Sequence, residues 1–139
     1  MDHEFDLDRF VSAQDPVYSE VLAELRTGKK RTHWMWFVFP QIAGLGRSEM
    51  ARTYAIASSD EAAAYLAHPV LGSRLRECAR LVATHRGMDA ADIFDGPDDR
   101  KFHSSMTLFN DIAPDEAVFQ TCLDQFFDGR PDAATLALL

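Results

Sequence analysis

The side chains best suited to chemistry lie in two stretches of the chain, and the first runs from His33 to Gln41. It reads His-Trp-Met-Trp-Phe-Val-Phe-Pro-Gln, contains both tryptophans of the protein, and follows a basic run between Arg26 and Arg31. Histidine is the common general acid or base near neutral pH, and an indole beside a cation can stack on a planar ligand. We therefore expect a pocket for a small anionic, planar ligand. Its tentative acid or base is His33, and its expected binding residues are Lys30, Trp34, Trp36 and Gln41.

His33, Gln41 and the two tryptophans also have a purely structural interpretation. His33 can be half-buried and donate to a backbone carbonyl, Gln41 can hydrogen-bond in a loop, and both indoles can pack in the core. Residues two apart on a helix point about 200° away from each other. One of Trp34 and Trp36 can therefore face the core while the other reaches a cleft, and the sequence leaves these alternatives open.

The second stretch surrounds Lys101, Ser104 and Ser105. At positions i, i+3 and i+4 these residues lie on one face of a helix, beside an apolar stripe. A cation and two hydroxyls at the edge of such a stripe suit a phosphate or a carboxylate. The alternative is that the serines bond back to the helix backbone and that Lys101 pairs with Asp98 or Asp99.

A glycine-containing loop, from Ala43 to Ser48, supplies one more candidate. It is similar to a phosphate-binding loop that enters a helix, so Ser48 is added to the expected binding residues. The loop lacks the full pattern of a P-loop or a dinucleotide-binding loop, and no strand precedes it. No cysteine–histidine spacing typical of a metal site is present, and we expect neither a metal nor a cofactor.

The elements that position these residues are helices, because helix starts and stops recur along the chain while strand patterns are nearly absent. The aromatic stretch itself is expected to form a short buried helix that Pro40 ends. The helix after Ser48 is expected to run from Glu49 to about Ala57. Expected helix starts are Asp6, Asp15-Pro16, Ser48, Ser58, Asp89, Gly96-Pro97, Pro114 and Asp132. The prediction is one compact all-α domain over residues 1–139, with roughly seven to ten short helices.

Composition narrows the classes of partner. The net charge is −8 and the pI is near 4.9, which argues against nucleic acid as the main partner because that affinity depends on a basic face. No apolar run approaches the length of a membrane span, and none opens the chain as in a signal peptide. Cys78 and Cys122 fall in apolar helical patterns and are expected to be buried free thiols of a cytoplasmic protein.

Several motifs are spread along the chain: Ala13-Gln14, Lys30, the stretch from His33 to Gln41, Gly44-Leu45-Gly46, Ser48, the run from Tyr65 to Gly72, Lys101 and the run from Ser104 to Phe109. Read together, they resemble one bacterial family, the domain of unknown function numbered 1810, some of whose members carry a misleading calpastatin label. The motifs cover nearly the whole chain. The resemblance implies an all-helical single domain and implies no activity.

Two functional hypotheses follow. In the first, the segment from His33 to Ser48 faces the helix of Lys101, and the cleft between them binds a nucleotide or ADP-ribose-like compound, with hydrolase or transferase activity if His33 takes part. In the second, the aromatic segment is core and the protein is a non-enzymatic module for protein–protein interaction. That hypothesis expects an exposed apolar patch, for instance at Leu136, Leu138 and Leu139.

Overall fold

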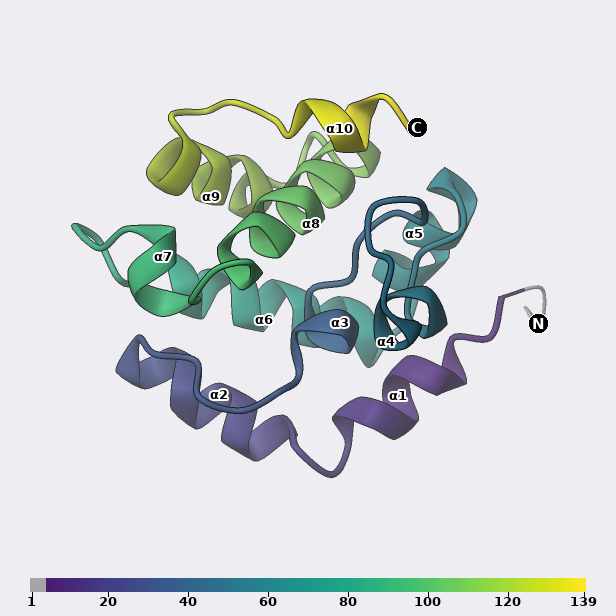
Figure 1. Cartoon of the computed structure of the whole chain (residues 1–139), viewed down its shortest axis with the longest axis horizontal. Coiled ribbons are helices and arrows are strands. Elements are labelled where there is room, and N and C mark those ends of the chain that lie inside the picture. Colours follow the sequence, from purple (N-terminus) through teal and green to yellow (C-terminus); the bar gives the residue numbers. More distant parts are fainter. Residues whose placement is uncertain (1–4) are drawn as a thin grey trace.

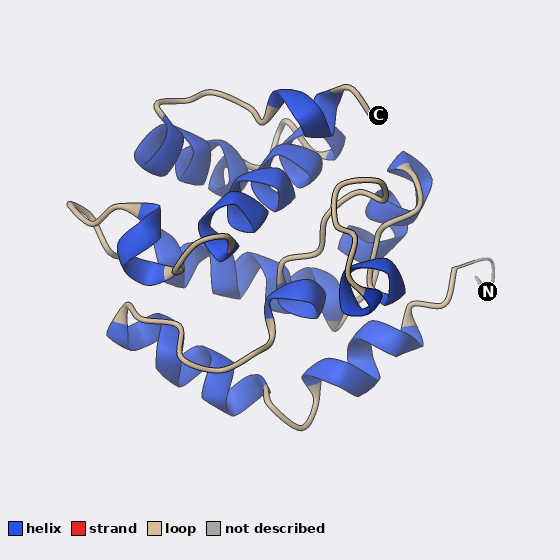
Figure 2. Cartoon of the chain, in the orientation of Figure 1, coloured by secondary structure: helices blue, strands red, loops and turns tan. Residues whose placement is uncertain are grey.

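The computed structural model describes residues 5–139, and within this range ten α-helices follow one another through short connections. They are α1 (Asp8–Gln14), α2 (Tyr18–Thr27), α3 (Met35–Val38), α4 (Glu49–Thr53), α5 (Ser59–Ala67), α6 (Leu71–Ala83), α7 (Ala90–Ile93), α8 (Asp98–Ile112), α9 (Ala117–Phe127) and α10 (Ala133–Leu136). In the described range no segment forms a strand (Figure 2), and the β-type pairing is limited to one parallel bridge, between Ile42 and Ile56. The predicted all-α fold is confirmed.

Two long helices, α6 and α8, organise the packing. Helix α6 contacts α2, α3, α5 and α9, and α8 contacts α5, α7, α9 and α10. Figure 1 shows α6 and α8 in the middle of the view, with α1 and α2 below them and α9 and α10 above. The expected stripe of α8, Phe102, Met106 and Phe109, is fully buried. Other helices cover α6 and α8 on several sides, and the buried side chains form one continuous hydrophobic core.

The aromatic stretch forms the short buried helix α3, as predicted. Trp34, Phe37 and Phe39 are buried, and the Phe39 ring packs edge-on against Phe102 of α8 at 5.0 Å between centroids. Helix α3 ends before Pro40, which has no N–H to continue the hydrogen bonding. The stretch is therefore anchored against α8, the helix that carries the second candidate group.

Both expected serine caps are present. The Ser48 hydroxyl accepts a hydrogen bond from the Ala51 N–H at 3.1 Å, and the Ser58 hydroxyl accepts one from the Glu61 N–H at 3.2 Å. Helix α4 ends at Thr53 rather than near Ala57. The reason is the bridge to Ile42, which requires an extended backbone at Ile56 and so stops the helix early.

Three helix starts were predicted too early. Helix α1 begins at Asp8, and the residue at its N-cap position is Leu7 rather than the expected Asp6. Helix α9 begins at Ala117 rather than at Pro114. Helix α2 begins at Tyr18 rather than at Pro16, because the Asp15 carboxylate pairs with Arg74 of α6 at 2.9 Å instead of capping its own helix. At Asp15 a tertiary contact thus overrides the local capping signal.

Both cysteines, Cys78 and Cys122, are buried free thiols, as expected. Burial raises the pKa of each thiol to about 12. Within residues 5–139 no helix is long and apolar enough to cross a membrane.

Candidate functional site

Glu24 of α2 fixes the loop that leads into the aromatic stretch. Its Oε1 atom accepts hydrogen bonds from the N–H groups of Arg31 and Thr32, at 2.7 and 3.0 Å, and from the Trp34 indole N–H at 2.9 Å. Its Oε2 atom accepts a hydrogen bond from the Thr32 hydroxyl at 2.6 Å. One buried carboxylate therefore sets the course of the loop that carries Lys30 and the orientation of the Trp34 indole.

The ionisation of Glu24 suits this role. Burial alone raises the pKa of a carboxyl group, but the hydrogen bonds from Thr32, Arg31 and Trp34 outweigh it. The pKa of Glu24 consequently lies below its usual value. The carboxylate is charged at neutral pH, and its hydrogen bonds have the strength of charge-assisted ones.

Two lysines from distant parts of the chain meet at the carboxylate of Asp98, the first residue of α8. Asp98 Oδ2 lies 2.9 Å from Lys30 Nζ, and Asp98 Oδ1 lies 3.5 Å from Lys101 Nζ. Each ammonium group also lies over an indole: Lys30 is 5.2 Å from the Trp34 ring centroid, and Lys101 is 5.3 Å from that of Trp36. We call these five residues the lysine–indole cluster.

The cluster has an inner and an outer half. The Lys30 side chain is 8% exposed, whereas those of Asp98 and Lys101 are 21% and 22% exposed. The cluster contains two cations and one anion, so its own net charge is positive in a chain whose total is −8. Its outer half, formed by Asp98, Lys101 and the half-buried Trp36, is the part that a molecule from solvent can reach.

Two buried polar atoms near this outer half have no hydrogen-bond partner within residues 5–139. They are Nε1 of Trp36 and Oγ of Ser105. Ser105 follows Lys101 by four residues and therefore lies on the same face of α8. An unpaired buried polar group costs about 1–3 kcal/mol, so such atoms are candidates for contact with a bound molecule.

A small cavity of about 120 Å³ borders the cluster at Trp36. It lies between the aromatic stretch, the glycine loop and α4, and its lining includes Trp36, Gln41, Gly44, Gly46, Arg52 and Tyr54. Gly46 has to be a glycine here, because a Cβ at this position would lie 2.4 Å from the Cβ of Ala51. Enclosing ligand pockets usually measure roughly 300–1,000 Å³, so this cavity holds one ring or one phosphate-sized group.

The structure brings together Lys30, Trp34, Trp36 and Lys101 in the cluster, with Gln41 in the adjoining cavity. Trp34 is 1% exposed and its N–H is bonded to Glu24, so its ring is closed to a ligand. Trp36 is the indole that can meet one.

Other candidate residues lie apart from the cluster. Ser104 turns toward the end of the chain, where its hydroxyl donates to the Arg100 carbonyl at 3.1 Å and to Asp132 Oδ2 at 3.3 Å. Ser48 is occupied as the cap of α4. His33 is exposed, and its ring makes no hydrogen bond within the part of the chain that the structure describes. Nor do His, Cys, Asp and Glu side chains of residues 5–139 gather in a group that would hold a metal ion.

Sequence reasoning missed Glu24 and treated Asp98 only as a helix-start residue or a partner for Lys101. A signal for Glu24 was available, since it lies between Val21 and Leu25 on the apolar face of its helix, where an unpaired carboxylate is not tolerated. No sequence signal connects Asp98 to Lys30, because the pairing depends on where α8 packs.

The fold and the site define a compact all-helical protein with a cation–indole cluster beside a small cavity. The chain belongs to the DUF1810 family, described as proteins of unknown function, whose model matches residues 4–139. It is similar to the conserved hypothetical protein Rv1873 from Mycobacterium tuberculosis, known from a crystal structure. The two chains share 51% sequence identity, the match covers 98% of this chain and 97% of the other, and the TM-score is 0.96. No curated protein matches the chain.

Proposed function

We propose that the protein binds a small anionic ligand with a planar part at the lysine–indole cluster. The observation that carries the proposal is the convergence of Lys30 and Lys101 on the carboxylate of Asp98. A carboxylate between two ammonium groups marks a position that favours negative charge, and a ligand phosphate or carboxylate would be favoured there for the same reason. Trp36 supplies the planar surface beside it, and its unpaired Nε1 supplies a donor.

The size of the cavity limits how such a ligand would bind. A volume of about 120 Å³ encloses one ring or one phosphate group. A nucleotide or an ADP-ribose-like compound would therefore place one part in the cavity, next to Gln41, and leave the rest on the open surface. Hydrolase or transferase activity on that ligand would require an acid or base, for which His33 is the candidate. His33 is exposed and its ring has no hydrogen-bond partner in the described part of the chain that would orient it toward a ligand. The proposal therefore rests on binding alone.

Asp98→Asn is the most informative variant, because it removes the carboxylate that competes with the ligand for both lysines. We expect tighter binding of AMP, ADP-ribose or ribose 5-phosphate by Asp98→Asn than by the wild type. Lys101→Ala should weaken binding at least about tenfold, since a hydrogen bond to a charged group contributes about 1.5–3 kcal/mol. The matched controls are Asp95→Asn and Lys29→Ala, which disrupt the exposed pair between Asp95 and Lys29 at 2.9 Å outside the cluster.

Binding is measured by calorimetry and by thermal shift. Ligand at about 100 times its Kd stabilises the folded state by about 2.7 kcal/mol, which raises Tm by several degrees in a chain of this size. In Trp34→Phe, Trp36 is the single indole, so its fluorescence and its quenching by iodide report directly on the site. The proposal fails if none of the three ligands stabilises the wild type or Asp98→Asn, or if Lys101→Ala binds them as the wild type does.

The alternative function, a module for protein–protein interaction, also has an observation in its favour. Leu136, Leu138 and Leu139 are 40–46% exposed at the end of the chain. A protein partner held there would lose affinity in a Leu138→Ser variant. The cluster variants Lys101→Ala and Asp98→Asn would leave that affinity unchanged, which separates the two functions.

A further inference from the structure

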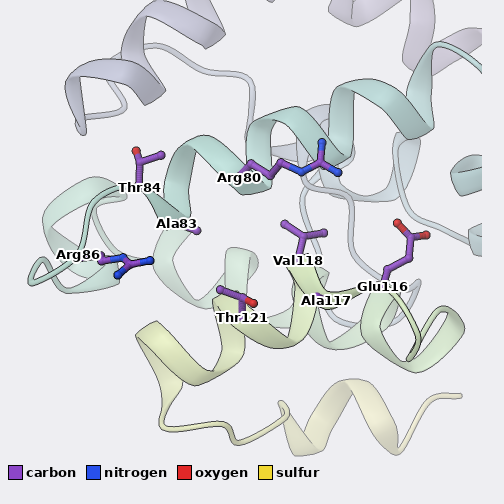
Figure 3. A pocket seen from close by; sticks show the side chains of 8 residues that line it. All are labelled: Arg80, Ala83, Thr84, Arg86, Glu116, Ala117, Val118 and Thr121. Carbon is purple, nitrogen blue, oxygen red and sulfur yellow. The ribbon is translucent and has the colours of Figure 1, made fainter.

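A second concave surface lies between α6 and α9 and shares no lining residue with the Trp36 cavity. It is a groove of about 690 Å³, a volume within the roughly 300–1,000 Å³ of ligand pockets. Figure 3 shows Arg80 on the α6 side, Val118 and Thr121 on the α9 side, and Arg86 extending from the loop after α6 toward the space between the helices.

The groove exists because small side chains line the place where the two helices separate. Deeper in the molecule the helices touch, and the Cys122 thiol donates to the carbonyl oxygen of Ala79 at 3.5 Å. Farther out, Ala83 of α6 and Ala117 and Val118 of α9 form an apolar floor. Because these side chains are short, they leave the space between the two helices open.

The charges around this floor are unbalanced in favour of cations. The carboxylate of Glu116 is held by two hydrogen bonds from Arg76, at 2.6 and 2.8 Å. The hydrogen bond from Arg76, with a smaller effect of the Arg80 charge, lowers the pKa of Glu116. Arg80 and Arg86 are exposed and form no ion pair with any residue in the range 5–139. In a chain with net charge −8, two unpaired arginines beside an apolar floor are a local site of positive potential.

We propose that the groove between α6 and α9 binds a small organic anion with an apolar body, such as an aromatic carboxylate. The anionic group lies at the guanidinium group of Arg86, which extends into the space between the helices and can donate two parallel hydrogen bonds to a carboxylate. Arg80, toward the other end of the groove, adds to the positive potential. The apolar body lies on Ala83, Ala117 and Val118. The Thr121 hydroxyl, at the edge of the groove, is a further donor.

The probe for this site is naphthalene-2-carboxylate, and its neutral counterpart is 2-naphthylmethanol. Each is titrated into the ¹⁵N-labelled protein while backbone amide shifts are followed. We expect the carboxylate to shift amides of residues 80–86 and 116–121, and to bind about tenfold more tightly than the alcohol. The double variant Arg80→Ala/Arg86→Ala should lose that advantage, whereas Arg26→Ala/Arg130→Ala, which removes two exposed arginines elsewhere, should keep it.

A second variant tests the floor. Val118→Asp places a carboxylate under the apolar body of the bound molecule and should abolish the amide shifts that the ligand causes. The amide spectrum of the variant reports whether its fold is intact. The proposal is overturned if the shifts gather around Trp36 instead, or if the acid and the alcohol bind equally. It is also overturned if the carboxylate keeps its advantage over the alcohol in Arg80→Ala/Arg86→Ala. None of these variants touches the lysine–indole cluster, so the outcome is independent of the function proposed for that cluster.

Discussion

Replacement of Glu24 tests how the site loop is held. In Glu24→Ala the buried Trp34 N–H loses its acceptor, and so do the N–H groups of Arg31 and Thr32. A buried donor without a partner costs about 1–3 kcal/mol, and water can partly satisfy the two half-buried backbone groups. We therefore expect the free energy of unfolding to fall by about 3–5 kcal/mol, a large part of the total stability of a domain.

Two controls separate pairing from charge. Glu24→Gln removes the charge and keeps an oxygen for the three N–H donors. Its NH2 group replaces the Oε2 that accepts from the Thr32 hydroxyl, and it can donate to that hydroxyl instead, so we expect a loss of about 1 kcal/mol. Glu20→Ala removes an exposed carboxylate from the same helix and should change stability by less than about 0.5 kcal/mol. Urea unfolding followed by far-UV circular dichroism measures all three variants. If Glu24→Ala costs no more than Glu20→Ala, or if Glu24→Gln costs as much as Glu24→Ala, the carboxylate does not hold the loop through these donors.

The pKa of Glu24 adds a dependence on pH. Because the folded-state pKa lies below the unfolded value of about 4.5, the unfolded chain takes up the proton first on acidification. The stabilisation by the charged carboxylate is therefore complete above about pH 4.5 and is lost as the pH falls through the folded-state pKa. The stability difference between wild type and Glu24→Gln should be constant near neutral pH and shrink in acid. A difference that grows in acid would contradict the sign of this pKa shift.

Further predictions concern a glycine and the two thiols. Gly72→Ala should cost about 3 kcal/mol, because its Cβ would lie 2.1 Å from the carbonyl oxygen of Leu66. Gly87→Ala, at φ +86° with open space around it, should cost only about 1–2 kcal/mol, and urea midpoints that rank the two the other way would contradict this. Cys78 and Cys122 should react with a disulfide reagent at pH 8 about a hundredfold more slowly in the native protein than in urea, since burial raises the pKa of both thiols to about 12. Equal rates in the two conditions would show that these helices open readily.

The class of fold and most of the helices can be predicted from the amino-acid sequence alone. Helical spacing, the serine caps at Ser48 and Ser58 and the stop at Pro40 act within a few residues of the chain, so they can be read without a structure. Helix ends were less predictable, as at Asp15, whose carboxylate serves Arg74 of another helix instead of its own.

Which candidate residues meet depends on how the helices pack. Sequence spacing allowed either indole to face the core. In the fold Trp34 is buried, with its N–H bonded to Glu24, whereas Trp36 is half-buried. Likewise Ser104 and Ser105 are neighbours on α8, yet Ser104 bonds toward the chain end while Ser105 is buried without a partner.

The physical reason is the range of the forces involved. Capping and helical periodicity depend on neighbours three or four residues apart, which the sequence specifies directly. The meeting of Lys30 and Lys101 at Asp98 depends on how α8 packs against the loop after α2, and that packing is set by the whole core. The candidate side chains can thus be identified from the sequence, whereas their shared contact with Asp98 follows from the tertiary packing.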